Sequence, residues 1–401
     1  MTQTSLTWTR ERAEEMDLED PLAEKRAEFW IPEGTVYLGG NSLGALPAAL
    51  SGRLQALAGD EWGRGLVASW EGAGWMQAPE RVGDKIARLI GAGAGEVIAA
   101  DSTTVGLTKA LLAAVSARRD RPTILTSTTN FPTDLYAATG VAALCPGVAL
   151  RAVAPDDLPG AIGDDVGVLF LTHVDYRTGA MFDLRGLTAA AHLAGALALW
   201  DLCHSAGAVP VGCEENGVDL AVGCGYKYLN GGPGAPGFLY VRRELSKQLA
   251  NPIRGWLGHA APFEFSAGWR PAEGIRSFLT SSPPILGLAG LEAGVDVFAD
   301  VGMADLRSKS MRLGELFVEA VSERSGELEL ASPRPAEERG SQVSFRHSRA
   351  AEIVETLAGS GIVGDFRPPD LCRFGLAPLY LRHVDVFDAA VGLCEAAAAL
   401  D

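Results

Sequence analysis

The chain has 401 residues, enough for about two or three domains with well-buried cores. Thirty-four Lys and Arg against fifty Asp and Glu give a formal net charge of −16 at pH 7, which disfavours nucleic acid and anionic membrane surfaces as partners. The six cysteines form no C-x-x-C pair, the start lacks the apolar core of a signal peptide, and no run of about 18 apolar residues occurs. We therefore expect a soluble cytoplasmic protein that acts on small molecules.

Residues 1–36 predict an N-terminal arm. A charged segment with a helical pattern, RERAEEMDLEDPLAEKRAEF, covers residues 10–29. It is followed by the helix-breaking sequence Ile31-Pro32-Glu33-Gly34. The arm is therefore expected to precede the main body of the fold.

Residues 37–290 predict a large α/β domain. Its apolar runs are EVIAADS (96–102), PTILTS (122–127), VGVLFLTHV (166–174), ALALWD (196–201) and GFLYVRR (237–243). Runs that are apolar throughout suit strands covered on both faces, so we expect a mainly parallel sheet flanked by helices. Ligands of such sheets bind at the carboxyl ends of the strands.

Residues 291–401 predict a smaller α+β domain at the C-terminus. A helical pattern over 308–324 precedes two short candidate strands, QVSFRH (342–347) and LCRFGLAPLY (371–380).

Lysine is scarce, with only six residues in the chain. Unlike arginine, lysine can act as a neutral amine near neutral pH, so any amine chemistry must come from this short set. Five lysines have charged or helix-forming neighbours and are expected on solvated helix faces: Lys25, Lys85, Lys109, Lys247 and Lys309. Lys227 differs, because it follows an apolar run and precedes a glycine-rich turn that leaves room for a flat ligand. Burial there would lower its pKa towards the range in which lysine forms Schiff bases.

Asp201 ends the run ALALWD and is followed by His204. A carboxylate at the end of a strand, followed by an isolated lysine, is the arrangement that holds pyridoxal phosphate (PLP). The carboxylate keeps the pyridine nitrogen protonated and the lysine forms the imine. Taken alone, Asp201 suits a helix N-cap equally well.

The phosphate of such a cofactor needs a helix N-terminus with free amides and hydroxyls. Thr103 and Thr104 provide one directly after EVIAADS. By itself the cluster of Ser102, Thr103 and Thr104 is only a good cap. The segment GAGAGE (91–96) departs from the dinucleotide fingerprint G-x-G-x-x-G at its last position, which points away from NAD.

Eight segments together resemble the successive motifs of the kynureninase family, which belongs to the fold type I, aminotransferase class V group of PLP enzymes. The segments are YLGGNSLGALP (37–47), DSTTVGLTKAL (101–111), NFPTDLY (130–136), LTHVDYRTG (171–179), WDLCHSAGAVPV (200–211), GCGYKYLNGGPG (223–234), GWLGH (255–259) and RFGLAPLY (373–380). The resemblance runs in order from about residue 30 to about residue 385.

The resemblance implies a role for each matching residue. Lys227 would form the Schiff base, Asp201 would pair with the pyridine nitrogen, Phe131 would stack on the ring, and Asp134 would be a second carboxylate. The cofactor and its phosphate would be surrounded by Thr103, Thr104, Thr172, His204 and Tyr226, joined by Trp256 and Ser282 from the second subunit of a homodimer. Tyr226 is also the candidate for moving protons.

The same resemblance implies substrate contacts. Arg373 would bind the α-carboxylate, a task suited to its bidentate fork, and the alternative is a surface arginine beside Cys372. Trp70 is a candidate wall for the aromatic ring of the substrate, although a core or interface tryptophan is an equal alternative. Ser282 lies at a position near the substrate.

The implied reaction is hydrolysis of L-kynurenine to anthranilate and L-alanine in tryptophan catabolism, with no metal ion. The sequence departs from the family pattern at three positions. Family members usually have Asp where this chain has Gly39, bacterial members often have Asn where it has Asp175, and His is common where it has Gln342. Asp175 and Ser282 leave the choice between kynurenine and 3-hydroxykynurenine open.

Two other functions remain as alternatives at this stage. A cysteine desulfurase or selenocysteine lyase on the same scaffold needs a nucleophilic cysteine near the substrate, and the late candidates are Cys372 and Cys394. The second alternative is a non-catalytic relative of the PLP fold that only binds a ligand or partner.

Overall fold

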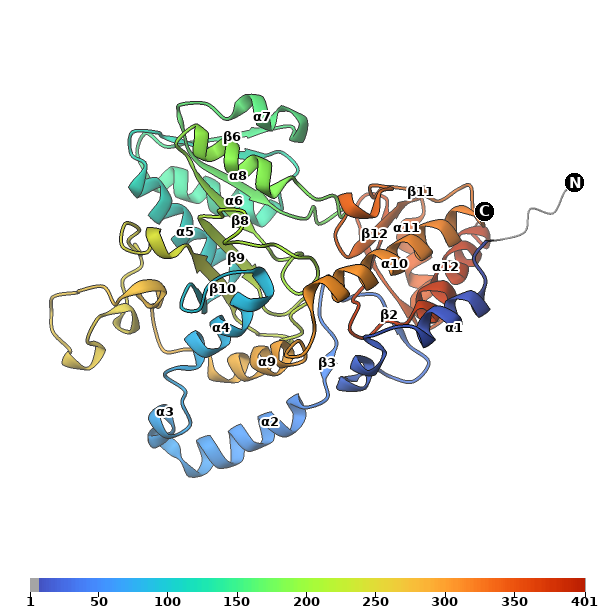
Figure 1. Cartoon of the computed structure of the whole chain (residues 1–401), viewed down its shortest axis with the longest axis horizontal. Coiled ribbons are helices and arrows are strands. Elements are labelled where there is room, and N and C mark those ends of the chain that lie inside the picture. The colour runs from blue at the N-terminus through green and yellow to red at the C-terminus, as the bar shows by residue number, and fades with distance from the viewer. Residues whose placement is uncertain (1–6, 401) are drawn as a thin grey trace, which may run out of the picture.

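The computed structural model describes residues 7–400, so the first six residues of the predicted arm and Asp401 lie outside it. A larger body surrounds a seven-stranded sheet and a smaller body contains a four-stranded sheet, with the N-terminal helix lying along the smaller body (Figure 1). Within residues 7–400 no helix is both long and apolar enough to cross a membrane. The predicted domain boundaries, 1–36, 37–290 and 291–401, remain a prediction.

The seven-stranded sheet has the order β4-β10-β9-β8-β7-β5-β6. Its strands are β4 (Val97–Ala99), β5 (Thr123–Ser127), β6 (Ala149–Val153), β7 (Val166–Thr172), β8 (Leu197–Asp201), β9 (Leu220–Cys224) and β10 (Gly237–Val241). β10 runs antiparallel to both neighbours and the other pairs are parallel, so the predicted fold class is confirmed. Every residue of β7 and β8 is buried, as expected for strands with both faces covered.

Helices cover both faces of this sheet. They are α4 (Ala78–Ile90), α5 (Thr103–Ala117), α6 (Pro132–Leu144), α7 (Leu158–Ala161), α8 (Leu184–Leu193) and α9 (Ile285–Asp296). Val168 and Phe170 of β7 pack with α5 and α6, whereas Leu169 and Leu171 belong to the core that contains α4 and α8. Ser102 caps α5 by accepting a hydrogen bond from the amide of Val105, as the sequence predicts.

The smaller body contains an antiparallel sheet in the order β11-β12-β15-β14. Its elements are α10 (Met303–Ser322), β11 (Glu329–Leu330), β12 (Gln342–Arg346), α11 (Ala350–Gly359), β14 (Asp365–Arg367), β15 (Leu371–Gly375) and α12 (His383–Ala398). α10 packs on α12, and β12 pairs with β15, so both strands predicted here are confirmed as neighbours in one sheet.

The N-terminal segments bridge the two bodies. They include α1 (Arg10–Leu18), β1 (Phe29–Trp30), β2 (Val36–Tyr37), β3 (Leu46–Pro47), α2 (Leu50–Ala56) with a π-helical continuation (Leu57–Arg64), and α3 (Ser69–Gly72). β1 pairs with β3, and β2 pairs with β13 (Ile362–Val363) of the smaller body. Short 3-10 turns occupy Ala23–Glu28, Leu66–Ala68, Pro155–Asp157, Arg243–Leu245, Trp256–Gly258, Pro262–Glu264, Gly274–Phe278 and Ala336–Glu338.

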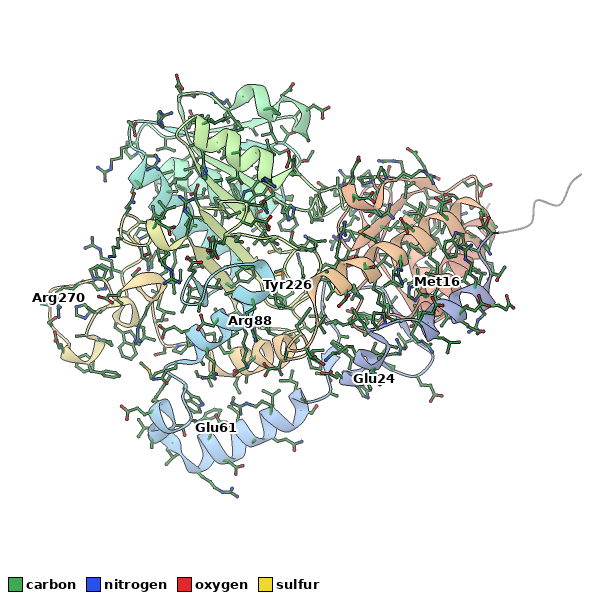
Figure 2. The ribbon with its side chains drawn as sticks, in the orientation of Figure 1. Met16, Glu24, Glu61, Arg88, Tyr226 and Arg270 are labelled. Atoms are coloured by element: carbon green, nitrogen blue, oxygen red, sulfur yellow. The ribbon has the colours of Figure 1, made fainter. Side chains whose placement is uncertain are left out.

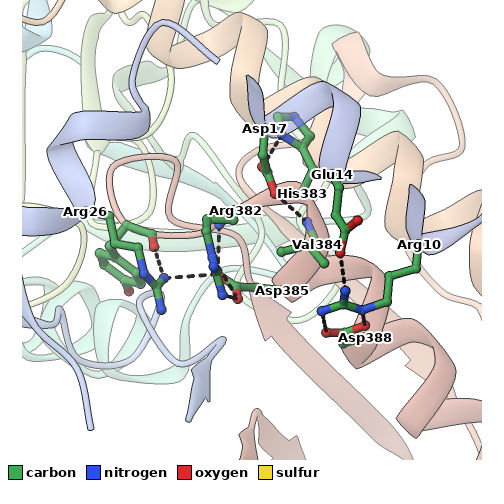
Figure 3. A network of polar contacts seen from close by, with 10 residues as sticks. Arg10, Glu14, Asp17, Arg26, Arg382, His383, Val384, Asp385 and Asp388 are labelled. Carbon is green, nitrogen blue, oxygen red and sulfur yellow. Dashed lines mark hydrogen bonds and ion pairs between the residues drawn. The ribbon is translucent and has the colours of Figure 1, made fainter. Parts of the chain in front are cut away.

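A polar network joins α1 to the start of α12 (Figure 3). The carboxylate of Asp17 accepts hydrogen bonds from the His383 ring at 2.9 Å and from the amide of Val384 at 3.1 Å, so it caps α12 from another segment. Nearby, the ammonium of Lys309 lies 2.6 Å from the carboxylate of Asp20, and both side chains are buried. The expectation that Lys309 lies on a solvated face is therefore wrong. Asp17, Asp20 and His383 lie close enough to hold a metal ion, but here Lys309 supplies the positive charge.

Candidate active site

Lys227 lies in the loop between β9 and β10 and is half-buried. It directly follows Tyr226, which lies near the centre of the molecule (Figure 2). Nζ of Lys227 is 3.3 Å from Nε2 of His204 and 6.0 Å from the ring centroid of Phe131. The segment around Gly44 packs against this loop, and the Gly44 amide donates a hydrogen bond to the Tyr226 carbonyl at 2.8 Å. A Cβ at Gly44 would collide with the Lys227 carbonyl oxygen, so this close approach requires glycine.

The charge state of Lys227 corrects the sequence-based expectation. Burial lowers the pKa of Lys227, but nearby Cys224, Cys203, Tyr226 and Asp201 together raise it by more, so the pKa lies above its ordinary value. The prediction of a lowered pKa considered burial alone and is wrong for this arrangement. Two strand ends, those of β8 and β9, bring these groups against the lysine.

His204 faces Lys227 as a neutral ring. The imidazole is fully buried, and burial, followed by the charges of Lys227 and Arg373, holds its pKa well below the usual range. A neutral imidazole is available to accept a hydrogen bond from the lysine ammonium. His204 therefore orients Lys227 without adding a second positive charge.

Two buried carboxyl groups, Asp201 and Asp134, face each other beside Lys227. Asp201 ends β8 and accepts a hydrogen bond from the Cys203 amide at 2.7 Å. Asp134 lies in the first turn of α6 and accepts one from the Thr172 hydroxyl at 3.2 Å. Burial, then the charge of Asp201, raises the pKa of Asp134 well above its usual value. The environment of Asp134 therefore favours its protonated form.

Asn130 connects the residues around Asp134 through hydrogen bonds, and the sequence analysis assigned it no role. Its side-chain oxygen accepts from the hydroxyl of Thr172 and, at 2.8 Å, from the amide of Phe131. Its amide nitrogen donates to Thr126 at 3.1 Å. Asn130 thereby sets the entry of α6 and the direction of Phe131. The available signal was a buried polar residue at the start of NFPTDLY, directly after a strand.

Thr103 and Thr104 begin α5, the helix that follows β4. The Thr103 hydroxyl lies 3.6 Å from the sulfur of Cys203, so the helix N-terminus adjoins the strand end that carries Asp201. A Cβ at Gly237 would lie 3.0 Å from the Thr103 nitrogen, which shows how closely β10 approaches this turn. Free amides and hydroxyls at a helix N-terminus are the donors that a phosphate needs.

Arg373 lies on β15 and its side chain is 1% exposed, so the alternative of a surface arginine is wrong. Its Nε is 2.8 Å from one carboxylate oxygen of Asp365 and its Nη2 is 2.5 Å from the other. The same guanidinium donates to the hydroxyl of Ser42 at 2.8 Å and to the carbonyl of Tyr176 at 2.5 Å. The Tyr176 ring packs edge-on against Phe131 at 5.0 Å, which links Arg373 to the lysine loop.

Asp365 is a further residue that sequence reasoning missed. Burial raises the pKa of Asp365. The hydrogen bonds and charge of Arg373, together with Ser42 and Arg367, lower this pKa by more, so the net shift is downward. Asp365 is therefore an anion that orients Arg373. Its position two residues before Arg367 on β14, a separate short strand, left no local signal for this contact.

Two of the three residues that depart from the family pattern, Asp175 and Gln342, support the loop that carries Tyr176. The Asp175 carboxylate accepts from the amides of Arg177 and Thr178 at 2.9 and 2.7 Å. The Gln342 side chain donates to the carbonyls of Asp175 and Tyr176, both at 3.2 Å. Gly39 forms a bridge to Gly375. All three positions thus have local structural partners.

Within the described part of the chain, no hydrogen bond, ion pair or ring contact joins Lys227 to three of the predicted residues, Trp70, Trp256 and Ser282. Trp70 packs edge-on against Trp75 at 5.4 Å and lines an apolar groove of about 600 Å³. Trp256 and Ser282 lie between β10 and α9, on a segment that projects from the larger body and carries Arg270 at its outer edge (Figure 2). Trp256 is 37% exposed and Ser282 is exposed.

The two late cysteines are not activated. Cys372 is fully buried in β15, and burial raises the pKa of its thiol to about 12. Burial also raises the pKa of Cys394, on α12, to about 11. A nucleophilic cysteine needs a lowered pKa and access to substrate, so this arrangement disfavours the desulfurase alternative.

The donor set fits PLP. A partly buried amine matches its aldehyde, and a flat aromatic ring matches its ring face. A carboxyl group at a strand end matches its pyridine nitrogen, and a helix N-terminus matches its phosphate. These groups are Lys227, Phe131, Asp201 and the first residues of α5.

Comparison with known proteins gives consistent relatives. A family model described as "Kynureninase C-terminal domain" matches residues 306–393. A protein named "Kynureninase" from Pseudomonas fluorescens is 48% identical, covering 96% of this chain and 95% of the relative. One of the same name from Deinococcus radiodurans is 49% identical with the same coverage. A third, from Burkholderia pseudomallei, is 46% identical over 95% of this chain and 94% of the relative.

Similar solved structures establish the fold. The apo cysteine desulfurase from Thermococcus onnurineus superimposes with a TM-score of 0.78 at 19% identity, covering 92% of this chain and 96% of its own. The cysteine desulfurase CsdA from Escherichia coli gives 0.77 at 22% identity, covering 93% and 98%. At these identities the likeness extends to the fold alone, which is that of PLP-dependent enzymes.

Proposed function

The chain belongs to the kynureninase family, and we propose that it hydrolyses the bond between the β and γ carbons of L-kynurenine to give anthranilate and L-alanine. The observation that carries the proposal is the placement of Lys227 against neutral His204 and the Asp134–Asp201 pair, in a chain that matches relatives named "Kynureninase" along nearly its whole length. The pathway would be tryptophan catabolism.

The residues that would hold PLP follow from the site. Lys227 would hold the aldehyde carbon, Asp201 the pyridine nitrogen and Phe131 the ring face, while Thr103 and Thr104 would bind the phosphate. When bound, PLP supplies an electron sink for the bonds that break at the substrate. Asp134, Thr172, His204 and Tyr226 would complete the surroundings.

Proton transfer would fall to Lys227 and Tyr226. Once its amine is neutral, Lys227 can remove the proton from the α-carbon of the substrate. Burial first, and then Cys224, raises the pKa of Tyr226 to about 12, so the phenol keeps its proton at neutral pH and can donate it. One water is consumed, since its hydroxyl joins the ketone carbon that becomes the carboxyl group of anthranilate and a proton joins the carbon that becomes the methyl group of alanine.

Arg373 would bind the α-carboxylate of the substrate. Its guanidinium is held in one orientation by Asp365, Ser42 and the Tyr176 carbonyl, which lowers the entropy lost on binding. Trp70 would contact the aromatic ring of the substrate, and Ser282 would lie beside it. Discrimination between kynurenine and 3-hydroxykynurenine would depend on Asp175 and Ser282.

The active unit would be a homodimer with shared sites. An apolar groove of about 920 Å³ lies beside the Lys227 loop, lined by side chains that include Trp30, Leu43, Leu46 and Leu286. Trp30 and Leu286 are more than half exposed in a single chain, as are Trp62, Leu66 and Val67. Such a surface suits contact with a second copy. In that arrangement Trp256 and Ser282 would reach the phosphate of the partner's cofactor.

The location of the protein would be the cytoplasm. All six cysteines are free thiols, which suits a reducing compartment.

A single comparative assay tests the proposal. PLP-loaded protein is given kynurenine, 3-hydroxykynurenine or cysteine, and the products are measured as anthranilate fluorescence, 3-hydroxyanthranilate absorbance or released sulfide. Anthranilate formation is expected. Sulfide without anthranilate would instead favour the desulfurase, and PLP binding without turnover of any substrate would favour a binding protein. Light scattering during gel filtration measures the proposed dimer.

A further inference from the structure

The residue before the phosphate-binding turn has a strained backbone. Asp101 follows β4 and has a φ of +56°, in the left-handed region that residues other than glycine adopt uncommonly, with asparagine and aspartate the more frequent exceptions. It immediately precedes Ser102, Thr103 and Thr104, whose amides and hydroxyls form the start of α5. Such strain persists only where surrounding contacts hold it.

Lys109 provides one of those contacts. From the second turn of α5 it reaches back towards the start of the helix, and its Nζ lies 2.5 Å from the Asp101 carboxylate and 2.8 Å from the carbonyl oxygen of Phe278. The Lys109 side chain is 1% exposed, so the expectation that it lies on a solvated helix face is wrong. A buried ammonium is tolerated where it is paired and hydrogen-bonded, as it is here.

The backbone around Asp101 leaves the turn little freedom. The Asp101 carbonyl accepts from the amide of Gly237 at 3.0 Å, and the Gly237 carbonyl accepts from the amide of Ala100 at 3.0 Å. A Cβ at Gly237 would lie 3.0 Å from the Thr103 nitrogen and 3.2 Å from the carbonyl carbon of Ser102. A change at Asp101 would therefore move the Thr103 amide.

We propose that Lys109 is a positioning residue for the phosphate of the cofactor. By pairing with Asp101 it holds the left-handed turn that aims the first amides of α5, although it does not touch the ligand itself. The inference rests on the proposed function, because it takes the PLP phosphate as the group that these amides bind. Without Lys109, the 26% exposed carboxylate of Asp101 turns to water and the backbone relaxes towards an unstrained conformation.

Lys109→Met is the first test, and Lys309→Met is its matched control. Both changes remove a buried ammonium paired with an aspartate, at 2.5 and 2.6 Å, but Lys309 lies in the smaller body. Pyridoxal 5′-phosphate is titrated into each apoprotein and its dissociation constant is measured by absorbance. We expect Lys109→Met to weaken PLP binding at least about tenfold and Lys309→Met to change it less than about twofold, although both lower the melting temperature.

Pyridoxal, which lacks the phosphate, is the ligand control. Lys109→Met is expected to leave the dissociation constant of pyridoxal within about twofold of the wild-type value, since the proposal concerns the phosphate alone. Equal weakening of both ligands, or equal PLP affinity in the two lysine variants, would overturn the proposal.

Asp101→Ala and Asp101→Gly form a second pair that remains decisive if Lys109→Met does not fold. Both delete the ion pair and leave Lys109 unpaired to the same extent, but only glycine adopts the left-handed conformation without strain. Asp101→Ala should therefore bind PLP at least about tenfold more weakly than Asp101→Gly. Equal affinities would contradict the role of the turn.

These readouts separate the two proposals. Wild-type protein that binds PLP with an affinity unaffected by Lys109→Met would overturn this inference and leave the proposed function intact. Wild-type protein that binds PLP but forms no anthranilate would overturn the proposed reaction and leave this inference standing. Wild-type protein that binds no PLP would overturn both.

Discussion

The protein contains two groups of buried charge that differ in how the pKa values of their side chains shift. In the arm cluster, defined by Asp17, Asp20, Lys309 and His383, Lys309 and Asp20 pair at 2.6 Å and the His383 ring meets Asp17 at 2.9 Å. Burial opposes the ionisation of Asp17, but the hydrogen bonds from His383 and Val384 outweigh it and lower the pKa of Asp17. The arm cluster thus joins α1 to the smaller body.

The lysine cluster, defined by Lys227, His204, Asp201 and Asp134, instead contains two groups whose environment favours their neutral forms. Its two carboxyl groups face each other, and Nζ of Lys227 lies 3.3 Å from the neutral ring of His204. The pKa of Asp134 is raised and that of His204 is lowered, so both shifts favour the neutral forms. Groups whose pKa values are strongly shifted by burial and by specific neighbours are concentrated at functional sites. The comparison teaches that burial alone does not separate a structural site from a reactive one, whereas the direction of the pKa shifts does.

Lys227→Ala should produce the largest effect, because it removes the proposed base and the amine that holds the cofactor. We expect turnover of kynurenine to fall at least about 10³-fold and the visible absorbance band of bound PLP to disappear. Lys247→Ala, at an exposed lysine, is the control and should keep both. A Lys227→Ala protein that retained band and turnover would remove the distinction between the two clusters.

Asp20→Ala should lower stability and leave catalysis unchanged, the opposite of Lys227→Ala. It leaves Lys309 buried without its partner, so the free energy of unfolding should fall by about 3–5 kcal/mol while the KM and kcat of the folded fraction stay unchanged. Urea denaturation and steady-state kinetics measure the two quantities. The double variant Asp20→Ala with Lys309→Met should recover part of the lost stability. A selective loss of kcat would show that the arm cluster takes part in catalysis.

Arg373→Ala tests a buried cation that is matched by Asp365 yet proposed to bind substrate. Because a charged hydrogen bond to the α-carboxylate is lost, the KM for kynurenine should rise about 10- to 100-fold, with a smaller change in kcat. Arg367→Ala, which removes another cation 3.0 Å from the same Asp365, is the control and should raise KM less. An equal KM in wild type and Arg373→Ala would exclude the proposed contact.

The pH dependence of stability gives the smallest effect and opposite signs for the two clusters. The folded-state pKa of Asp17 is lowered, so its contribution is present above the unfolded value of about 3.9 and is lost as the pH falls through the folded pKa. Asp17→Asn should therefore reduce the free energy of unfolding by about 1 kcal/mol at pH 6, and the difference from wild type should vanish in acid.

Asp134→Asn is the counterpart in the same measurement. The folded-state pKa of Asp134 is raised, so its contribution is present below about pH 3.9 and is lost as the pH rises towards the folded pKa. Relative to wild type, Asp134→Asn should gain stability as the pH rises over this interval. Denaturation curves between pH 3 and pH 8 check both variants, and parallel pH profiles for the two would contradict the assignment.

Much of the fold was predictable because it depends on neighbours along the chain. The apolar runs of β7 and β8, the cap at Ser102 and the helix of α10 all follow from local periodicity and capping. Lys227 was recognisable for a similar reason, since its glycine-rich surroundings differ from those of the other lysines. The burial of Lys109 was not predictable, because helical spacing does not reveal a contact with the carbonyl of Phe278.

The sequence by itself determined which side chains were available for chemistry: a single lysine in a glycine-rich turn, a carboxylate at a strand end and hydroxyls at a helix N-terminus. The tertiary structure decided how these side chains are charged. Because β7 lies between β5 and β8, it brings Asp134, which follows β5, against Asp201 at the end of β8. The same packing places thiols beside Lys227 and Asp365 beside Arg373. Desolvation and charge interactions act through space over a few ångströms, so the order of the strands controls them.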